Sequence, residues 1–309
     1  MEADDPADGV DSRISVILVT GFLGSGKTTF LKRLAAEHPE WHLLFLVNEF
    51  AETSVDAETL AFEGLPSQSV VGGSLFCECK ASDFIKVMRE TVLAMNEKQR
   101  LDAVVIETSG IADPEAIGCL MEDHGLAEFF NVQRIVTIVA ANNFLKLVSN
   151  LPVITAQVRS SDLIILNKTD LSDESTIAQA ESAVREINTT TAIQRSSYCE
   201  NLSFKLAGHV VELPRGELST CDANPFCVVE LTIPGGRSLA ETEKWIRELP
   251  PEVLRVKGSF RTVEGAWAAE RTVDSLEIRE AVLEGEGRLV LIAHEDHESL
   301  LQTCATGIL

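Results

Sequence analysis

The fold is decided by residues 21–29, which read Gly21-Phe22-Leu23-Gly24-Ser25-Gly26-Lys27-Thr28-Thr29. An apolar, β-branched run ends directly before them at Thr20, and a helical spacing of apolar residues begins directly after them at Phe30. This order of strand, glycine-rich loop, Lys-Thr pair and helix is that of a phosphate-binding P-loop. The residues that we expect to bind a nucleotide here are Gly21, Gly24, Ser25, Gly26, Lys27, Thr28 and Thr29.

The residue types of this loop suit a polyphosphate. Glycines let successive backbone N–H groups point inward, where a Cβ atom would obstruct the phosphates. Lys27 supplies a positive charge for the β- and γ-phosphates, and the Thr28 hydroxyl reaches a bound Mg²⁺ ion. The sequence therefore predicts a nucleoside triphosphate and magnesium at this loop.

The choice of base is indicated by Asn167-Lys168-Thr169-Asp170, which follows the apolar run 163–166. Open α/β sheets bind ligands at the carboxyl ends of their strands, and these residues follow such an end. The Asp170 carboxylate can accept two hydrogen bonds from guanine, whereas adenine would leave it unpaired. Asn167 can brace the loop, and the stem of Lys168 can cover the base. The motif therefore predicts GTP as the nucleotide.

A third motif contains two acids, Asp102 and Glu107, five positions apart on one predicted strand. At about 3.3 Å per residue they lie roughly 16 Å apart, so only one can share the P-loop edge of a parallel sheet. Glu107, at the carboxyl end, is the expected carboxylate on the magnesium side. Gly110 follows and can bring its N–H to the γ-phosphate. We therefore expect Lys27, Thr28 and Glu107 to be the catalytic set; the residue that positions the attacking water is not identified.

Together these motifs resemble the CobW-like branch of the P-loop GTPases, relatives of the urease and hydrogenase accessory GTPases. The resemblance covers about residues 13 to 300 and includes four further stretches: 48–52 with Asp56, 107–114, 166–171 and 254–260. It implies a GTPase that serves metal-centre or cofactor homeostasis as metallochaperone, insertase or activator. It also implies that Asp56 joins Thr28 and Glu107 in the Mg²⁺ set.

The chain departs from this family at its cysteine cluster. Members usually carry Cys-x-Cys-Cys after a glycine pair, but here Gly72-Gly73 is followed by Ser74, Leu75, Phe76, Cys77, Glu78 and Cys79. Serine is a poor ligand for a soft metal and phenylalanine is none. Two interpretations stay open for Cys77 and Cys79. They hold Zn²⁺ or another transition metal with Glu52 or a partner's side chains, or they are small buried hydrophobic residues.

Composition indicates a cytoplasmic protein that does not bind nucleic acid or span a membrane. The net charge is −22, which disfavours phosphate backbones as partners. Apolar runs reach only about seven residues, too few for a spanning helix. Residues 1–11 are acidic and lack the features of a signal peptide. The seven cysteines are odd in number and scattered, which is typical of reduced thiols.

The chain alternates predicted strands and helices, which favours an α/β fold with a doubly wound, mainly parallel sheet. Strands are expected at 14–20, 43–47, 103–107, 134–140 and 162–166, and helices at 28–38, 82–98, 114–123 and 173–188. The stretch 48–71 has no clean period and is expected to be a switch region. A smaller α+β unit follows, with strands at 226–233, 253–262, 264–272 and 288–293 and helices at 238–248 and 297–304. The expected divisions are an acidic tail (1–12), a GTPase domain (13–195), a connector (196–224) and a small domain (225–309).

Two functions follow from these observations. The first is a GTP-hydrolysing metallochaperone or activator of a metal-cofactor protein, with slow intrinsic turnover and a client metalloprotein as partner. The second is a GTP-dependent interaction switch that assembles a client without a metal of its own. The sequence leaves open the metal, the client and whether the chain forms a homodimer.

Overall fold

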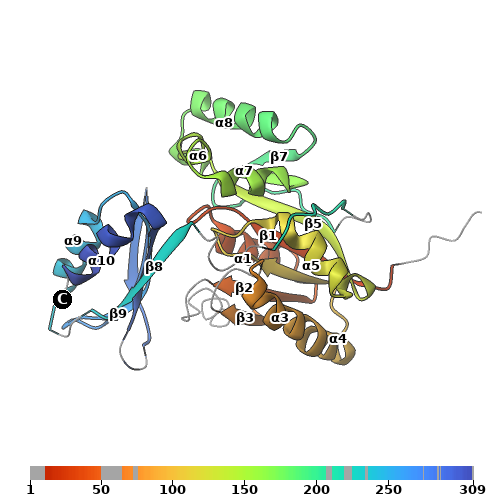
Figure 1. The fold of residues 1–309 in the computed structure, drawn as a ribbon, viewed down its shortest axis with the longest axis horizontal. Coiled ribbons are helices and arrows are strands. Elements are labelled where there is room, and N and C mark those ends of the chain that lie inside the picture. The colour runs from red at the N-terminus through yellow and green to blue at the C-terminus, as the bar shows by residue number, and fades with distance from the viewer. Residues whose placement is uncertain are drawn as a thin grey trace, which may run out of the picture.

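The protein was studied as a computed structural model that describes residues 11–49, 65–71, 76–206, 211–218, 225–233, 236–273, 275–283, 285 and 287–307. Within these residues, two β-sheets form the centres of two units that lie side by side (Figure 1). No helix in the described ranges is long and apolar enough to cross a membrane.

The first sheet has seven strands in the order β3-β2-β4-β1-β5-β6-β7, and neighbouring strands run parallel. Strand β4, which lies between β2 and β1, is buried along its whole length, which explains its unbroken apolar run. All five predicted strands are present, and β3 and β7 extend the two edges. The strands are β1 (Ile14–Thr20), β2 (Leu43–Glu49), β3 (Ser67–Val71), β4 (Ala103–Glu107), β5 (Phe130–Ala140), β6 (Leu163–Asn167) and β7 (Ala192–Arg195).

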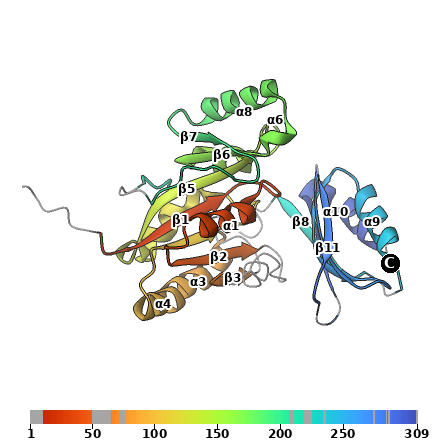
Figure 2. The same cartoon turned by 180° about the vertical axis from the view of Figure 1, so that it is seen from behind.

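Helices cover both faces of this sheet. Successive strand residues point to opposite faces, so Val16 and Leu18 pack toward α3 and α5, whereas Ile17 and Val19 pack toward α1. Figure 1 shows the first of these faces and Figure 2 the second. The helical elements are α1 (Lys27–Glu37), α3 (Glu78–Lys86), η1 (Val87–Val92), α4 (Leu93–Lys98), η2 (Pro114–Ala116), α5 (Ile117–Asp123), η3 (Leu126–Glu128), α6 (Phe144–Val148), α7 (Pro152–Arg159), η4 (Thr169–Leu171) and α8 (Glu174–Ile187).

Sequence patterning missed the strands β3 and β7, the helices α6 and α7, and the short 3-10 helices η3 and η4 of the first unit. No strand was predicted within the expected switch region 48–71, but at 67–71 β3 pairs in parallel with β2. The residues of β3 include three that are polar, so no apolar period marks the strand; pairing at the sheet edge forms it. A signal for α7 was available, since Pro152 occupies its first turn.

The stretch interpreted as a connector packs against the first unit in its described parts. Cys199 and Phe204 join the apolar cluster under α1, where the Phe204 ring meets Phe30 edge-to-face with ring centroids 5.7 Å apart. Leu213 and Leu218 pack on the cluster at the opposite face. These segments are therefore held in place by burial of apolar side chains on both sides of the sheet.

The second unit is a five-stranded antiparallel sheet in the order β11-β10-β9-β12-β8, with helices on one side. Its core includes the buried side chains of Phe260, Ile246 and Leu301. Helix α9 begins with a capping box between Ser238 and Glu241. The elements are β8 (Phe226–Leu231), α9 (Leu239–Glu248), β9 (Val253–Arg261), β10 (Ala266–Thr272), β11 (Leu276–Glu280), β12 (Leu289–His294), η6 (Glu295–His297) and α10 (Glu298–Thr306).

The second sheet lies against the side of the first unit at which the strands of the first sheet have their carboxyl ends. The arrowheads of β2 and β3 point toward it in both views (Figures 1 and 2). One apolar cluster contains Phe22, Leu23 and Ile111 of the first unit together with Phe226 and Ile292 of the second. The edge at which parallel strands bind ligands therefore also contacts the second unit.

Candidate nucleotide site

The P-loop joins β1 to α1 and takes its shape from glycines. Gly21, Gly24 and Gly26 have φ angles of 134°, 71° and 109°, which side-chain-bearing residues rarely adopt. At Gly26, a Cβ atom would lie 2.4 Å from the Asn167 side-chain nitrogen. That nitrogen donates a hydrogen bond of 2.9 Å to the Ser25 carbonyl. A side chain at position 26 would therefore break the link between the P-loop and the base motif.

Lys27 is buried, and its ammonium group turns back into the loop. Its Nζ donates to the Gly21 carbonyl at 2.8 Å and to the Phe22 carbonyl at 3.3 Å. Thr28 follows in the first turn of α1, where the N-terminal end of a helix favours bound anions. Ser25 is also buried and lines a cavity of about 20 Å³ behind the loop, large enough for one water molecule.

The sheet register places one of the two motif acids beside the P-loop. Strand β4 lies between β1 and β2, and Glu107 is paired with Val19 and Val47 at their carboxyl ends. Glu107 is only 4% exposed. Asp102 lies at the opposite end of β4, where its carboxylate accepts a 2.8 Å hydrogen bond from the backbone of His42. Glu107 alone of the two shares the P-loop edge.

The segment after β4 is fixed by two amide side chains. The Ser109 N–H donates to the Asn48 side chain at 3.3 Å. Gln157 of α7, which is 1% exposed, donates to the carbonyls of both Gly110 and Ala112 at 3.1 Å. Sequence reasoning missed Gln157 because a single glutamine in a short helix has no distinctive pattern.

Gly110 also lies against the P-loop. A Cβ atom there would be 2.7 Å from both the backbone nitrogen and the Cδ2 atom of Leu23. Leu23 in turn belongs to the cluster shared with the second sheet. A displacement of Gly110 would therefore act directly on Leu23, which packs against both units.

The base motif is tied to the P-loop and to a further loop. Asn167 donates to Ser25, as described, and its side-chain oxygen accepts from the Cys199 N–H at 3.1 Å. Lys168 has a φ of 60°, which turns the chain sharply after β6. The Asp170 side chain is exposed at this turn.

The further loop, Ser196–Cys199, follows β7 and was interpreted from sequence as the start of a connector. The Ser197 hydroxyl accepts from the Asp170 N–H at 3.1 Å and lies 2.9 Å from the Thr169 hydroxyl. The Ser196 carbonyl accepts from the Thr169 N–H at 3.2 Å. The loop thus holds the base motif in place through hydrogen bonds to Thr169 and Asp170. The role of this loop was not predicted, because strand β7, which precedes it, was not predicted either.

The Cys199 thiol is part of this support rather than a reactive group. Its Sγ lies 3.7 Å from the Gly26 carbonyl and donates to it. Burial raises the pKa of the Cys199 thiol to about 12, because the thiolate would lose its hydration. The group is therefore a neutral donor at physiological pH.

Two predicted transition-metal ligands, Glu52 and the side chain of Cys79, and the predicted magnesium ligand Asp56 cannot be placed from the described residues. Cys77 is buried before α3, and its neighbour Phe76 packs in the core with Phe84. Within the described ranges, no group of three or more His, Cys, Asp or Glu residues could hold a metal ion.

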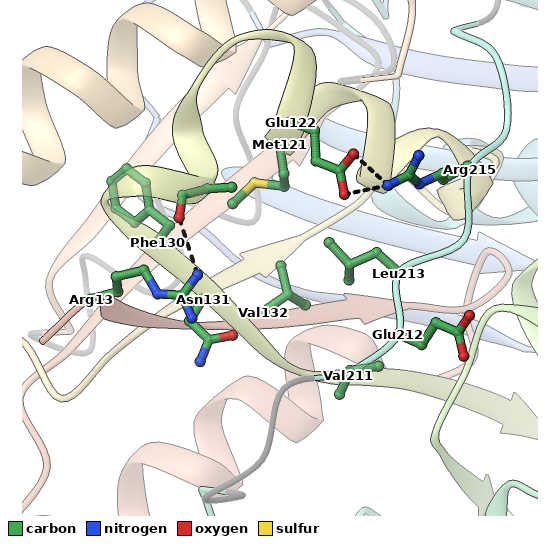
Figure 3. Close-up of a pocket in the computed structure, with 11 residues that line it drawn as sticks. Arg13, Met121, Glu122, Phe130, Asn131, Val132, Val211, Glu212, Leu213 and Arg215 are labelled. Carbon is green, nitrogen blue, oxygen red and sulfur yellow. Dashed lines mark hydrogen bonds and ion pairs between the residues drawn. The ribbon is translucent and has the colours of Figure 1, made fainter. Parts of the chain in front are cut away.

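A second cavity, of about 650 Å³, opens near the amino ends of β1 and β5, away from the P-loop (Figure 3). Its two arginines are already engaged. Arg13 pairs with Asp11 at 2.7 Å and donates to the Ala127 carbonyl at 3.1 Å. Arg215 pairs with Glu122 at 2.7 Å. These cations are therefore poorly placed to bind the phosphates of a nucleotide.

Several curated proteins are similar to this chain in sequence. The zinc-regulated GTPase metalloprotein activator 1 of Saccharomyces cerevisiae is 27% identical over 213 residues, covering 61% of this chain and 49% of that protein. The zinc chaperone YjiA of Escherichia coli is 28% identical over 163 residues, covering 52% and 51%. The chain thus spans about half the length of these two curated relatives. The zinc chaperone YeiR of Escherichia coli is 27% identical over 316 residues, covering 90% and 93%.

Among solved structures, the Zn(II)-bound YjiA GTPase from E. coli aligns with a TM-score of 0.48 and 18% identity, covering 96% of this chain and 99% of that chain. Residues 15–195 match the family described as CobW/HypB/UreG, nucleotide-binding domain. This match spans the P-loop, Glu107 and the base motif, and it covers more than half of the chain. The chain therefore belongs to the CobW/HypB/UreG family of P-loop GTPases.

Proposed function

We propose that this protein binds GTP with Mg²⁺, hydrolyses it slowly, and uses the cycle to deliver a metal to a client metalloprotein or to activate that client. The observation that supports this best is the meeting of Lys27, Glu107 and the base motif at one sheet edge, with the second unit packed beside them. The direct test is release of GDP and phosphate from GTP by purified protein, with and without Mg²⁺.

The residues present fit magnesium. Mg²⁺ takes oxygen ligands and is commonly held by one or two protein groups plus substrate phosphates. The Thr28 hydroxyl and the buried Glu107 carboxylate are oxygen donors at the P-loop edge, and Asp56 is the further candidate. When bound, the ion neutralises charge on the β- and γ-phosphates. Lys27, Gly21, Gly24, Ser25, Gly26 and Thr29 would orient the phosphates, and Asn167, Lys168 and Asp170 would hold the guanine.

The metallochaperone role is supported by the names of the relatives, two of which are zinc chaperones and one a metalloprotein activator. Zn²⁺ is therefore the first metal to test, with Cys77, Cys79 and Glu52 as candidate ligands. The described cysteines Cys77, Cys119, Cys199, Cys227 and Cys304 are free thiols. The alternative, a switch without its own metal, is favoured by Phe76, which fills the core where a family ligand is usual.

Leu23 supplies a route from the nucleotide to the second unit. It contacts Gly110, the residue expected to sense the γ-phosphate, and it packs in the cluster that includes Phe226 and Ile292. Packed clusters transmit displacements because they are not freely compressible. Loss of the γ-phosphate would thus alter how the second sheet sits on the P-loop.

Replacement of Leu23 by alanine is expected to weaken this coupling. Amide hydrogen exchange in β8 and β12 should differ between the GTP-analogue and GDP states of wild type, and this difference should shrink in Leu23→Ala. Stability should fall by about 2–4 kcal/mol, because a buried leucine is lost.

Leu147→Ala is the matched control, because Leu147 lies in the same cluster but comes from α6. It should lower stability similarly and keep the nucleotide-dependent exchange difference. An unchanged difference in Leu23→Ala would show that coupling does not pass through this residue.

The thiol pair is tested by zinc titration in each nucleotide state. If Cys77 and Cys79 hold Zn²⁺ in a site linked to the switch, affinity should differ by at least about fivefold between the GTP-analogue and GDP states. Reciprocity then requires zinc to change the preference for the two nucleotides by the same factor. The double variant Cys77→Ser/Cys79→Ser should lose both effects.

Cys119→Ser serves as the control, since Cys119 is a free thiol on α5. It should bind zinc like wild type. Equal and weak binding by wild type and the double variant in both states would mean that the pair is structural. The metal-free switch would then be the better account of the protein.

A further inference from the structure

Tyr198 is an exposed aromatic residue in the loop that supports the base motif. Its exposed fraction is 65%, which places it among the few large hydrophobic side chains of the described surface that are open to solvent. Phe129, Val263 and Val282 belong to other connections of the chain, before β5, between β9 and β10, and after β11. Leu171, 60% exposed, directly follows Asp170. Tyr198 is therefore placed beside the proposed base site rather than in a broad apolar surface.

The residues on both sides of Tyr198 form hydrogen bonds with nucleotide-site residues, Ser197 through its hydroxyl and Cys199 through its backbone N–H. Ser197, before it, accepts from the Asp170 N–H, and Cys199, after it, donates to Asn167. Glu200 forms an ion pair with Arg33 of α1, and its carbonyl accepts from the Ser196 hydroxyl at 2.8 Å. Tyr198 is thus presented from a fixed loop, so little freedom would be lost when a ligand packs on its ring.

The loop conformation is unfavourable for these residue types. Tyr198 and Cys199 have φ angles of 55° and 54°, in the left-handed region that glycine and asparagine adopt more readily. Strain of this kind persists where the surroundings enforce it, and it gathers at ligand sites. Tyr198 therefore combines an exposed ring, a strained backbone and a position beside Asp170, and these features together indicate a ligand contact made by the ring.

We propose that Tyr198 is a further nucleotide-binding residue that packs its ring on the guanine base of the bound nucleotide. The inference rests on the proposed function, because it requires a guanine nucleotide at Asp170. The Asp170 carboxylate would accept hydrogen bonds at the edge of the base, so the two faces of the base stay open for packing by neighbouring side chains. Base–aromatic stacking is a general source of affinity, and Tyr198 is the only tyrosine of the chain.

The test compares GDP binding by calorimetry for wild type, Tyr198→Phe, Tyr198→Ala and Tyr198→Asn. Phenylalanine keeps the ring and should stay within about twofold of wild type. Alanine and asparagine remove the ring and should lower affinity by about tenfold. Asparagine tolerates the left-handed backbone, so equal losses in both variants would assign the effect to the ring.

Inorganic tripolyphosphate separates stacking from a structural role. It carries phosphates but no base, so all four proteins should bind it equally. Val282→Ala is the control for loss of an exposed hydrophobic side chain, since Val282 is 95% exposed in the second unit. It should bind GDP like wild type.

A direct readout comes from 3-fluorotyrosine, which labels this chain at one position. Its fluorine resonance should shift on addition of GDP and stay in place with tripolyphosphate. Unchanged GDP affinity in Tyr198→Ala would overturn the inference. Parallel losses of GDP and tripolyphosphate would also overturn it, because the loop would then only support the site. Absence of GDP binding by wild type would instead refute the proposed function.

Discussion

Lys27→Ala is expected to reduce GTP hydrolysis by at least about a hundredfold, because a preorganised charge at the transferring phosphate is lost and water cannot replace it. The Lys27 ammonium is buried and held within the loop by the carbonyls of Gly21 and Phe22. The ammonium group therefore lies within the loop that we expect to bind the phosphates. Phosphate release from GTP under multiple turnover is the measurement.

Lys98→Ala is the matched control, since Lys98 is an exposed lysine at the end of α4. It should hydrolyse GTP like wild type. Thermal melts of both variants would establish that the fold persists. Near wild-type turnover in Lys27→Ala would mean that the activity comes from another site or a contaminant.

Asp170→Asn is expected to lower GTP affinity by at least about tenfold, or 1.4 kcal/mol. Asparagine keeps the size of the side chain but replaces one acceptor oxygen with a donor that guanine cannot satisfy. Xanthosine triphosphate offers an acceptor in place of the guanine amino group, so its binding should be partly restored in the variant. Calorimetric titrations with GTP, ATP and xanthosine triphosphate compare the three bases.

Asp173→Asn provides the control, because Asp173 lies three positions away and caps α8 through the Thr176 N–H at 2.7 Å. Asparagine also caps helices well, so this change should leave both stability and GTP affinity nearly unaltered. Wild-type protein that binds ATP as tightly as GTP would rule out Asp170 as the residue that selects the base.

The departure at the cysteine cluster limits which side chains could bind a metal in this chain. Phe76 is 1% exposed and packs with Phe84 and Met88, so it contributes to the core where relatives are expected to present a thiol. A metal site in this chain would need ligands from elsewhere, with Cys77 as its best-placed described thiol. A low ligand count favours release, which a chaperone requires, and it equally favours a switch with no metal.

Local sequence was sufficient for the central elements of the first unit. Strands β1, β2, β4, β5 and β6 are mostly apolar and mostly buried, so their side chains show the pattern that hydrophobic burial imposes. The same spacing argument distinguished Glu107 from Asp102, and the pairing of Glu107 with Val19 places the two acids at opposite ends of β4. The edge strands β3 and β7 are short and partly polar, so their pairing, rather than their composition, decides that they are strands.

The sequence by itself determined the P-loop, the base motif and the family, because glycines, a Lys-Thr pair and an Asp at fixed spacing are local chemical requirements. Only the tertiary structure decided that Gln157 holds the carbonyl of Gly110, that Ser197 supports Asp170, and that Leu23 joins the P-loop to the second sheet. These contacts link residues that are far apart in the chain. They form where helices, strands and loops pack against one another, and tertiary contacts of this kind have no periodic or compositional signature in the sequence.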